Sequence, residues 1–346
     1  IILCDMIPAE ETLDITKNTI IAGMNPNCGL YRVSDNLDEM ITVYDTISLT
    51  LLGLNIDGKN MVANEQVIFV NGYPNVYSWS FEPDYDTNTR HYKYADVNIV
   101  DCNVHNCSVH GRDGAVVEAD YSNLTMINSS FTHNYASNGG VASFVQRDDF
   151  FSYGDPERYN RYYNRFVIRN SVLSYNEASS SGGAISLDGS RYWPNTCINS
   201  SGWQDECLDA DGREVLQHAG LEIWDSEISY NSANRSGAID PSAGLIGLRG
   251  NTVISHNISQ TDGGVSYDGS NGGVFLMYEN SMLAYNTAEE GGAIYCSEYT
   301  FQLHDEAKVC FNRAVGDGLY NGRGGGIFLG WSEYLCKISD NASIFG

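Results

Sequence analysis

A short motif recurs along this chain: an apolar residue, a small or polar residue, an aromatic residue and Asn, followed a few residues later by a glycine step. Copies end at Asn134, Asn176, Asn231, Asn257, Asn286 and Asn312, and a degenerate copy ends at Asn106. Such self-similarity is typical of solenoids, in which each repeat packs mainly on its neighbours. It predicts one elongated domain over residues 1–346, which we interpret as a segment of a longer chain.

The spacing of the motif sets the size of the repeat. From Asn231 to Asn257 there are 26 residues, and from Asn257 to Asn286 there are 29. Two intervals are longer, and they predict insertions at about 146–165 and 188–214 on the outside of the solenoid. Residues 1–95 are expected to form less regular N-terminal coils, and residues 96–346 the clear repeats.

Each repeat contains short stretches in which apolar and polar residues alternate, bounded by Gly, Asn, Asp and Ser. In the segment 182–187 the alternation places Ile185 and Leu187 on one face and Ser186 on the other, and the same pattern recurs around Ile294 and in Ile327 and Leu329. Alternation of this kind indicates strands. A repeat of this length accommodates about three strands of about five residues. We therefore predict an all-β fold, a right-handed parallel β-helix.

Two columns of side chains follow from stacking the repeats. The repeated Asn residues are expected to form a structural ladder at one corner, with their amides hydrogen-bonded from coil to coil. The residues before them form an aromatic column: His133, Tyr175, Tyr230, His256, Tyr285 and Phe311. Its histidines lie in non-adjacent repeats, so they favour a stacking column over a metal site, whose ligands must converge.

The repeats resemble those of the polymorphic outer membrane proteins of chlamydiae. The resemblance rests on Phe131-Thr132-His133-Asn134 and on Gly291-Gly292-Ala293-Ile294, and it covers about residues 100–346. It implies a right-handed β-helical passenger domain exposed at a cell surface. The same repeat type also occurs in large surface proteins of protists and algae.

Composition narrows the set of partners. There are 19 Lys and Arg against 44 Asp and Glu, a net charge of −25. This charge argues against nucleic acid and anionic membranes as partners. No apolar run is long enough to span a membrane. The chain begins without Met and ends within a repeat, so we expect a processed or partial piece of a longer protein.

Cysteines and glycosylation sequons together indicate an extracellular or cell-surface location. Nine cysteines suggest an oxidising compartment, with short-range pairs expected at Cys4–Cys28, Cys102–Cys107 and Cys197–Cys207. The pairing of Cys296, Cys310 and Cys336 stays open. Among seven sequons, N-linked glycans are expected at Asn128, Asn199, Asn341, Asn234 and Asn123, whereas Asn257 and Asn106 should be bare because the ladder occupies them.

Candidate chemistry is sparse in this sequence. No cofactor motif and no metal motif is evident, and the carboxylates do not recur at one repeat position. His110, Arg112 and Asp113 lie together, but at a turn before a glycine step. The first insertion is rich in residues favoured at recognition surfaces, and it is either a binding loop or packed onto the coil. The residues concerned are Tyr153, Arg158, Tyr159, Arg161, Tyr162 and Tyr163.

These observations predict a non-catalytic, glycosylated, structural or adhesive β-helix in a surface or filamentous assembly such as a fibre or flagellar hair. Its partners would be further copies, other surface proteins or glycans. Two alternatives stay open: a polysaccharide lyase or glycosidase of the same fold, and an adhesin passenger of an autotransporter.

Overall fold

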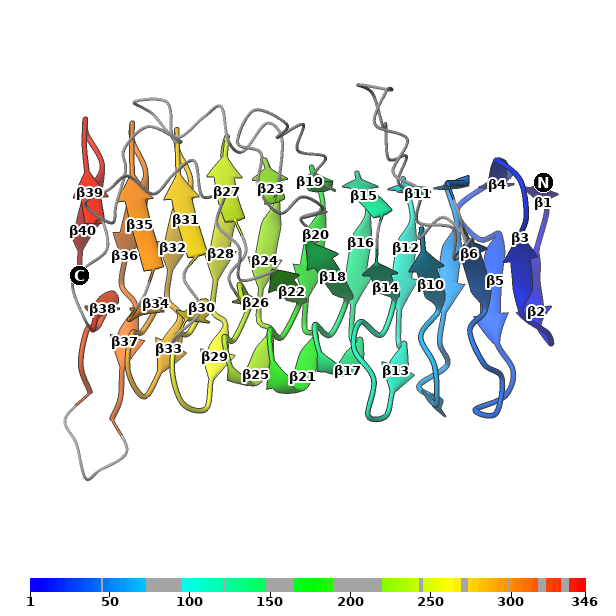
Figure 1. The fold of residues 1–346 in the computed structure, drawn as a ribbon, viewed down its shortest axis with the longest axis horizontal. Coiled ribbons are helices and arrows are strands. Elements are labelled where there is room, and N and C mark those ends of the chain that lie inside the picture. The colour runs from blue at the N-terminus through cyan, green and yellow to red at the C-terminus, as the bar shows by residue number, and fades with distance from the viewer. Residues whose placement is uncertain are drawn as a thin grey trace, which may run out of the picture.

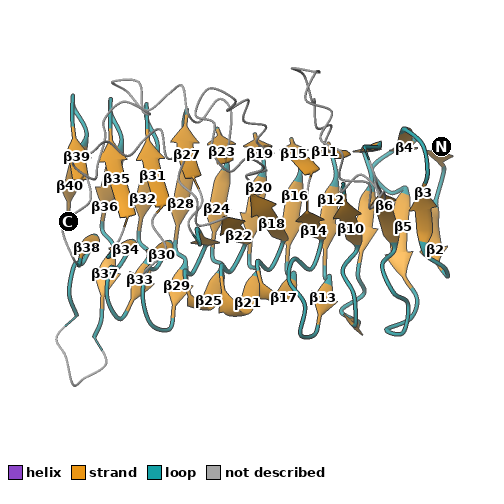
Figure 2. Ribbon diagram, in the orientation of Figure 1, coloured by secondary structure: helices purple, strands orange, loops and turns teal. Residues whose placement is uncertain are grey.

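The computed structural model describes residues 1–44, 46–72, 95–120, 122–146, 165–189, 220–242, 245–268, 273–297, 299–316, 322–330 and 336–346. Within these residues the fold is all-β, and Figures 1 and 2 show strands side by side along one long axis from the N-terminus to the C-terminus. None of the described residues belongs to a helix that is long and apolar enough to cross a membrane.

The strands form long sheets in which every pair is parallel. Sheet A contains β1 (Ile2–Leu3), β4 (Thr19–Gly23), β7 (Ser48–Leu52), β11 (Ala95–Val100), β15 (Ser122–Ile127), β19 (Arg165–Arg169), β23 (Gly220–Trp224), β27 (Leu245–Arg249), β31 (Gly273–Met277), β35 (Tyr299–Leu303) and β39 (Cys336–Ile338). Sheet B contains β2 (Met6–Ala9), β5 (Gly29–Arg32), β8 (Asn55–Asp57), β12 (Asn103–His105), β16 (Ser130–Thr132), β20 (Val172–Ser174), β24 (Glu227–Ser229), β28 (Val253–Ser255), β32 (Met282–Ala284), β36 (Lys308–Cys310) and β40 (Ser343–Phe345).

Three further sheets complete the stack. Sheet C contains β3 (Leu13–Ile15), β6 (Ile41–Tyr44), β10 (Ile68–Asn71), β14 (Val117–Asp120), β18 (Ala142–Gln146), β22 (Ile185–Gly189) and β26 (Ile239–Asp240). Sheet D contains β9 (Val62–Ala63), β13 (Ser108–Val109), β17 (Tyr135–Asn138), β21 (Glu177–Ser181), β25 (Ser232–Arg235), β29 (Ile258–Ser259), β33 (Thr287–Ala288) and β37 (Arg313–Ala314). A three-stranded sheet contains β30 (Ser266–Asp268), β34 (Ile294–Cys296) and β38 (Ile327–Leu329).

The chain visits the sheets in a fixed order. After β11 in sheet A, the chain forms β12 in sheet B, β13 in sheet D and β14 in sheet C. It then returns to sheet A as β15, which pairs with β11. This path is consistent with a parallel β-helix. The central coils have four short strands instead of the three expected, because the corner of each repeat separates sheet B from sheet D. The coils around β1 to β6 lack a strand in sheet D.

The strand register confirms the repeat length. Val97 pairs with Leu124, 27 residues later, and Phe275 pairs with Phe301, 26 residues later. The two predicted insertions fall between β18 and β19 and between β22 and β23, and most of their residues lie outside the described part of the chain. A further long coil separates Phe301 from Cys336 by 35 residues. The Asn anchors did not reveal it, because no anchor follows Asn312.

Alternation along the strands builds the core. Ile185 and Leu187 are fully buried while Ser186 is half-buried, as the sequence pattern predicts. Leu329 departs from the pattern and is 48% exposed, because β38 is an edge strand of the three-stranded sheet. On β31, Phe275 and Met277 join the main core, and the residues alternating with them form a second apolar cluster: Val274, Leu276 and Tyr278. Alternate residues of a strand face opposite sides of its sheet, so this cluster lies on the outward face of sheet A.

The glycine step permits a close approach between successive coils. A Cβ on Gly264 would lie 2.1 Å from the carbonyl oxygen of Gly292 in the next coil. A Cβ added to Gly183 or Gly237 would likewise lie 2.3 or 2.4 Å from the corresponding carbonyl oxygen of the next coil. A Cβ at these three positions would clash with the backbone, which explains why the second glycine of the step is kept in successive repeats from Gly140 to Gly292.

We expect Gly264→Ala to destabilise the fold by about 3 kcal/mol, because the added methyl group forces two backbones apart. Gly111→Ala is the matched control: its φ is +70°, but nothing lies within 4 Å of the added Cβ. That variant should lose only about 1 kcal/mol, from the left-handed conformation alone. Equal losses of unfolding free energy in urea would contradict the close-approach explanation.

Candidate functional site

The corner between sheets B and D carries the most regular side-chain arrangement in the described structure. Its inner layer is the predicted Asn ladder: Asn134, Asn176, Asn231, Asn257, Asn286 and Asn312, each 7% exposed or less. The ladder is confirmed. Its outer layer is the aromatic column, one residue earlier in each coil.

The ladder amides from Asn176 to Asn286 each make at least four hydrogen bonds, as Asn231 illustrates, and the end members Asn134 and Asn312 make three. The Oδ1 of Asn231 accepts from the backbone N–H and from the side-chain amide of Asn176, both at 2.9 Å. Its Nδ2 donates to the Oδ1 of Asn257 and to the carbonyl of Leu173, both at 3.0 Å. Every donor and acceptor of this buried amide is therefore used, which removes the usual cost of burying it.

The degenerate repeat has a different register from the one the sequence suggested. Because Thr132 pairs with His105, the counterpart of Asn134 is Cys107, and its backbone N–H donates to the Oδ1 of Asn134 at 3.0 Å. Asn106 instead takes the position of His133, with φ of +59°. Asn106 is therefore outside the ladder, although its amide contacts Asp57 and His105.

The aromatic column is stacked and exposed. Ring centroids of successive members lie 4.8 to 5.4 Å apart, with interplanar angles of 4° to 18°. Tyr175, Tyr230, Tyr285 and Phe311 are 46% to 53% exposed. The stacking column predicted from the sequence is confirmed, and the column presents ring edges to solvent along five coil steps.

The sequence pattern did not reveal the backbone conformation of this column. All six aromatic residues have φ between +55° and +58°. A bulky residue in this region costs roughly 1–2 kcal/mol. The following Asn offsets this cost, because each of its side-chain hydrogen bonds contributes about 1 kcal/mol. The turn and the ladder therefore require each other.

A second buried ladder occupies the corner between sheets A and B. The Oγ of Ser129 accepts from the backbone N–H of Cys102, and the N–H of Ser129 donates to the Oγ of Ser171, both at 3.1 Å. The N–H of Ser171 continues the row to Ser226. Sequence reasoning missed this ladder, although a small hydroxyl residue four positions before the aromatic residue of each aromatic–Asn pair was the available signal.

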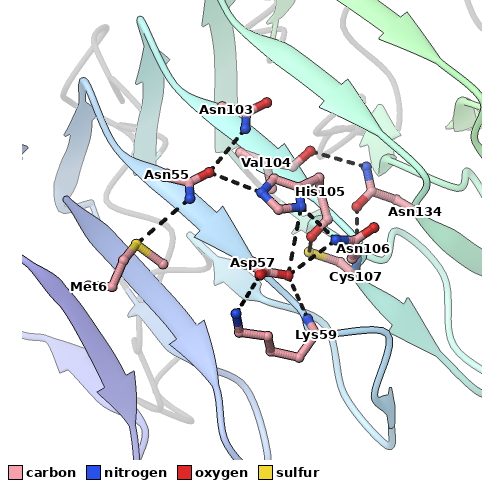
Figure 3. A network of polar contacts seen from close by, with 10 residues as sticks. All are labelled: Met6, Asn55, Asp57, Lys59, Asn103, Val104, His105, Asn106, Cys107 and Asn134. Carbon is pink, nitrogen blue, oxygen red and sulfur yellow. Dashed lines mark hydrogen bonds and ion pairs between the residues drawn. The ribbon is translucent and has the colours of Figure 1, made fainter. Parts of the chain in front are cut away.

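The Asn ladder ends in a polar cluster on β8 and β12 (Figure 3). The Asp57 carboxylate accepts from Lys59 at 2.8 Å and from the amide of Asn106 at 3.3 Å, and His105 bonds to Asn55. Burial raises the pKa of Asp57, but the hydrogen bonds from Lys59 and Asn106 outweigh burial and leave this pKa below its ordinary value. The cluster therefore holds an ionised carboxylate at the surface of the corner.

A group of carboxylates surrounds Glu118 on β14. Burial, together with the charges of Asp113, Glu65 and Asp120, raises the pKa of Glu118 to about 7, although Arg112 opposes the shift. Arg112 pairs with Glu65 at 2.6 Å, and Asp113 accepts from Asn138 at 2.9 Å. The turn residues Arg112 and Asp113 singled out in the sequence thus belong to this group, and His110 is exposed beside them.

Turns between sheets A and B present the sequons to solvent. Asn128 and Asn341 are exposed there, and the amide of Asn341 donates to Glu306. Asn234, on β25, is also exposed. Asn123 is half-buried on β15, and its amide donates to Asp96 at 2.9 Å. The predicted bare sequon Asn257 is completely buried in the ladder.

Two of the predicted disulfides are absent, because Cys4, Cys28, Cys102 and Cys107 all carry thiols. Cys102 and Cys107 lie at opposite ends of strand β12, so an extended chain of about 3.3 Å per residue holds their Cα atoms well beyond disulfide reach. Cys4 is exposed and its thiol contacts the sulfur of Met24, whereas Cys28 is buried. Burial raises the pKa of the Cys107 thiol to about 12.

Several predicted residues lie outside the described part of the chain. They are the Cys197–Cys207 pair, the sequon at Asn199, and the loop residues Tyr153, Arg158, Tyr159, Arg161, Tyr162 and Tyr163. Among the residues that are described, no group of three or more His, Cys, Asp or Glu side chains is arranged to hold a metal ion. No protein-family model, curated protein or solved structure matches this chain.

We expect Asn231→Ala to cost about 3–4 kcal/mol of unfolding free energy, because two buried N–H donors of Asn176 lose their acceptor at about 1–3 kcal/mol each. Asn251→Ala, in an exposed turn, is the matched control and should stay within about 0.5 kcal/mol of the parent. Urea denaturation measures both. A loss below 1 kcal/mol for Asn231→Ala would show that the ladder does not stabilise the corner.

The raised pKa of Glu118 predicts a pH dependence of stability. Because the folded protein holds this proton more tightly than the unfolded chain, stability should fall as pH rises from about 4.5 to about 7 and then level off. Glu118→Gln should remove this part of the pH profile and be the more stable protein above pH 7. Glu177→Gln, at an exposed position, should leave the profile unchanged. Thermal denaturation from pH 4 to pH 8 tests this, and parallel profiles for both variants would refute it.

Proposed function

We propose that this chain is a right-handed parallel β-helix that serves as an extracellular, glycosylated structural or adhesive element of a cell-surface or filamentous assembly. The observation that carries the proposal is the uninterrupted stack of coils, tied together by buried ladders and lined by the exposed aromatic column. Such a stack positions the same surface groups at each coil step, and this suits repeated lateral contacts better than a single substrate pocket.

Three further features support the proposal. Right-handed crossovers dominate parallel strand connections, which supports the handedness. The net charge of −25 is far from zero, and a large net charge favours solubility in an extracellular setting. Asn128, Asn341 and Asn234 expose their side chains at turns or on the outer face, where a glycan can project into solvent. The matching motifs of the chlamydial surface proteins agree with a surface role, and they favour adhesion as one form of it.

Antibody labelling of intact cells tests the location. Gold-labelled antibodies against residues 220–346 should decorate the surface or extracellular fibres of unpermeabilised cells in electron micrographs. A preimmune serum and an antibody against a cytosolic marker are the controls. Labelling that requires permeabilisation would contradict the proposal.

Glycopeptide mass spectrometry of the native protein tests the modification. We expect glycan at Asn128, Asn199, Asn341 and Asn234. We also expect it at Asn123, provided that the glycan is attached before the Asn123 amide forms its hydrogen bond to Asp96. Asn257 should be bare, because a glycan on its Nδ2 would disrupt the hydrogen bonds that this nitrogen donates to Ile228, Ser255 and Asn286. Asn106 should also be bare, since its amide is held by Asp57 and His105. Full occupancy of Asn257 with none at Asn128 or Asn341 would contradict this assignment.

The carboxylates around Glu118 favour a second candidate function, cleavage of a polysaccharide. A carboxyl with a pKa of about 7 is protonated often enough near neutral pH to donate a proton to a leaving oxygen, while Asp113 or Asp120 could act as base or nucleophile. Release of reducing ends from acidic or neutral polysaccharides measures this activity. Turnover that Glu118→Gln abolishes would establish the enzyme in place of the structural role, and no turnover would exclude this candidate for the substrates used.

A further inference from the structure

Two rows of outward-facing residues flank the aromatic column. The row on sheet B lies three positions before the aromatic residue of each coil, and the row on sheet D lies two positions after it. The strand register fixes the order of the sheet B row as Val172, Glu227, Val253, Met282 and Lys308. It fixes the order of the sheet D row as Glu177, Ser232, Ile258, Thr287 and Arg313. We call the column from Tyr175 to Phe311 together with these two rows the association face, and Figure 1 shows its strands in order along the stack.

The charges of the association face are separated along the stack. Glu177 and Glu227 lie in the two coils nearest its N-terminal end, whereas Lys308 and Arg313 lie in the coil at its C-terminal end. All four residues are exposed. None of the four forms an ion pair with any residue that the structure describes. Their charges are therefore available to a partner.

The middle of the association face is largely apolar, and its rows carry no Asp, Glu, Lys or Arg there. Ile258 and the rings of His256 and Tyr285 are exposed, and Val253 and Met282 are half-buried. An interface between proteins usually has a centre that is rich in aromatic and apolar side chains and poor in charge, with polar groups toward its edge. The association face has this composition.

We propose that the association face binds the same face of a second copy of this chain, with the two stacks antiparallel and related by a two-fold axis. This inference rests on the proposed structural role, and it names the partner of the lateral contacts. Elsewhere two copies with a net charge of −25 repel each other, so a contact between them requires a face whose charges are complementary. A two-fold contact is self-complementary, because each contact between two different residues occurs twice.

Antiparallel pairing places unlike charges opposite each other in both rows. A two-fold axis that lies in the contact plane and runs across the stack brings each row against its own copy in the reverse direction. Glu227 of one copy then faces Lys308 of the other, and Glu177 faces Arg313. The first two residues are three coil steps apart and the second two are four. The centres of the two pairs thus differ by half a step, about 2.4 Å, which the long Lys and Arg side chains can absorb.

Parallel pairing is disfavoured by the same charges. An axis along the stack brings the sheet B row of one copy against the sheet D row of the other in the same coil. Lys308 would then face Arg313, and like charges opposed across an interface cost several kcal/mol. The distribution of charge therefore selects the antiparallel arrangement.

Sedimentation velocity of the purified chain, made in a host that adds no N-glycans, tests the contact. We expect a monomer–dimer equilibrium that weakens as NaCl is raised, because salt screens exposed charge pairs. Glu227→Lys and Lys308→Glu should each raise the dimer Kd at least about tenfold, since each opposes like charges. The double variant should return the Kd close to the parent value, because it restores both pairs with their signs exchanged. Asp35→Lys, an exposed position outside the face, is the control for the change in net charge and should leave the dimer intact.

A ring variant tests the centre of the face. Tyr285→Asn removes one ring, and Asn tolerates the left-handed conformation, as Asn106 does at the equivalent position of its own coil. We expect a weaker dimer with an unchanged circular dichroism spectrum. Tyr44→Asn removes an exposed ring from sheet C and should leave the Kd unchanged.

Two results would overturn the proposal. One is a chain that stays monomeric up to its highest soluble concentration. The other is an oligomer that ignores the charge reversals, as stacking of coil ends would. Monomeric protein together with antibody labelling of the cell surface would refute this inference alone, and the proposed surface role would stand.

Discussion

The hydrogen bond between ladder asparagines of neighbouring coils is the interaction on which the rest of the structure depends. It lets the chain turn sharply from sheet B to sheet D without leaving buried polar groups unpaired. The turn places a bulky residue in the left-handed region, and the next residue then points its amide into the stack, where the amide of the following coil receives it. An aromatic ring outside and an amide inside are two consequences of one backbone conformation.

Because of this coupling, the corner could be predicted well from the sequence. The Asn anchors and the glycine step each repeat at a fixed interval, so six ladder positions and their aromatic neighbours could be assigned by alignment of the chain with itself. Alternation along short segments predicted Ile185 and Leu187 as core residues, and they are buried. The two large insertions also followed from the spacing, because an insertion moves the next anchor by its own length.

Where the repeat is weak, the prediction was wrong or incomplete. The copy at Asn106 was placed one residue out of register, because Cys107 occupies the ladder position with a side chain that resembles no other member. The fourth strand of the coils that follow β7 was missed, since sheet D strands of two to five residues show too little alternation to be recognised. The Glu118 group was predicted only in part. The sequence singled out Arg112 and Asp113, which lie near Glu118 along the chain, but Glu65 is distant in sequence and is brought to them only by stacking.

The disulfide predictions illustrate the same limit. Short separation in sequence suggested pairs such as Cys102 and Cys107, yet a strand between two residues holds them apart. Phe301 and Cys336, 35 residues apart in sequence, are paired because one turn of the solenoid returns the chain to the same position. In a stack of coils, proximity is governed by the phase around the coil and by the number of coils between two residues, and sequence distance alone is a poor guide.

The direction of the inter-coil hydrogen bonds has a mechanical consequence. In parallel sheets these bonds run along the stack, so tension applied to the two chain ends loads the outermost coil first and peels it away from its neighbour. A coil of 26 residues that is pulled straight yields about 90 Å of chain, whereas the stack shortens by only about 4.8 Å. The folded rod is therefore a compact store of extensible length, released one turn at a time.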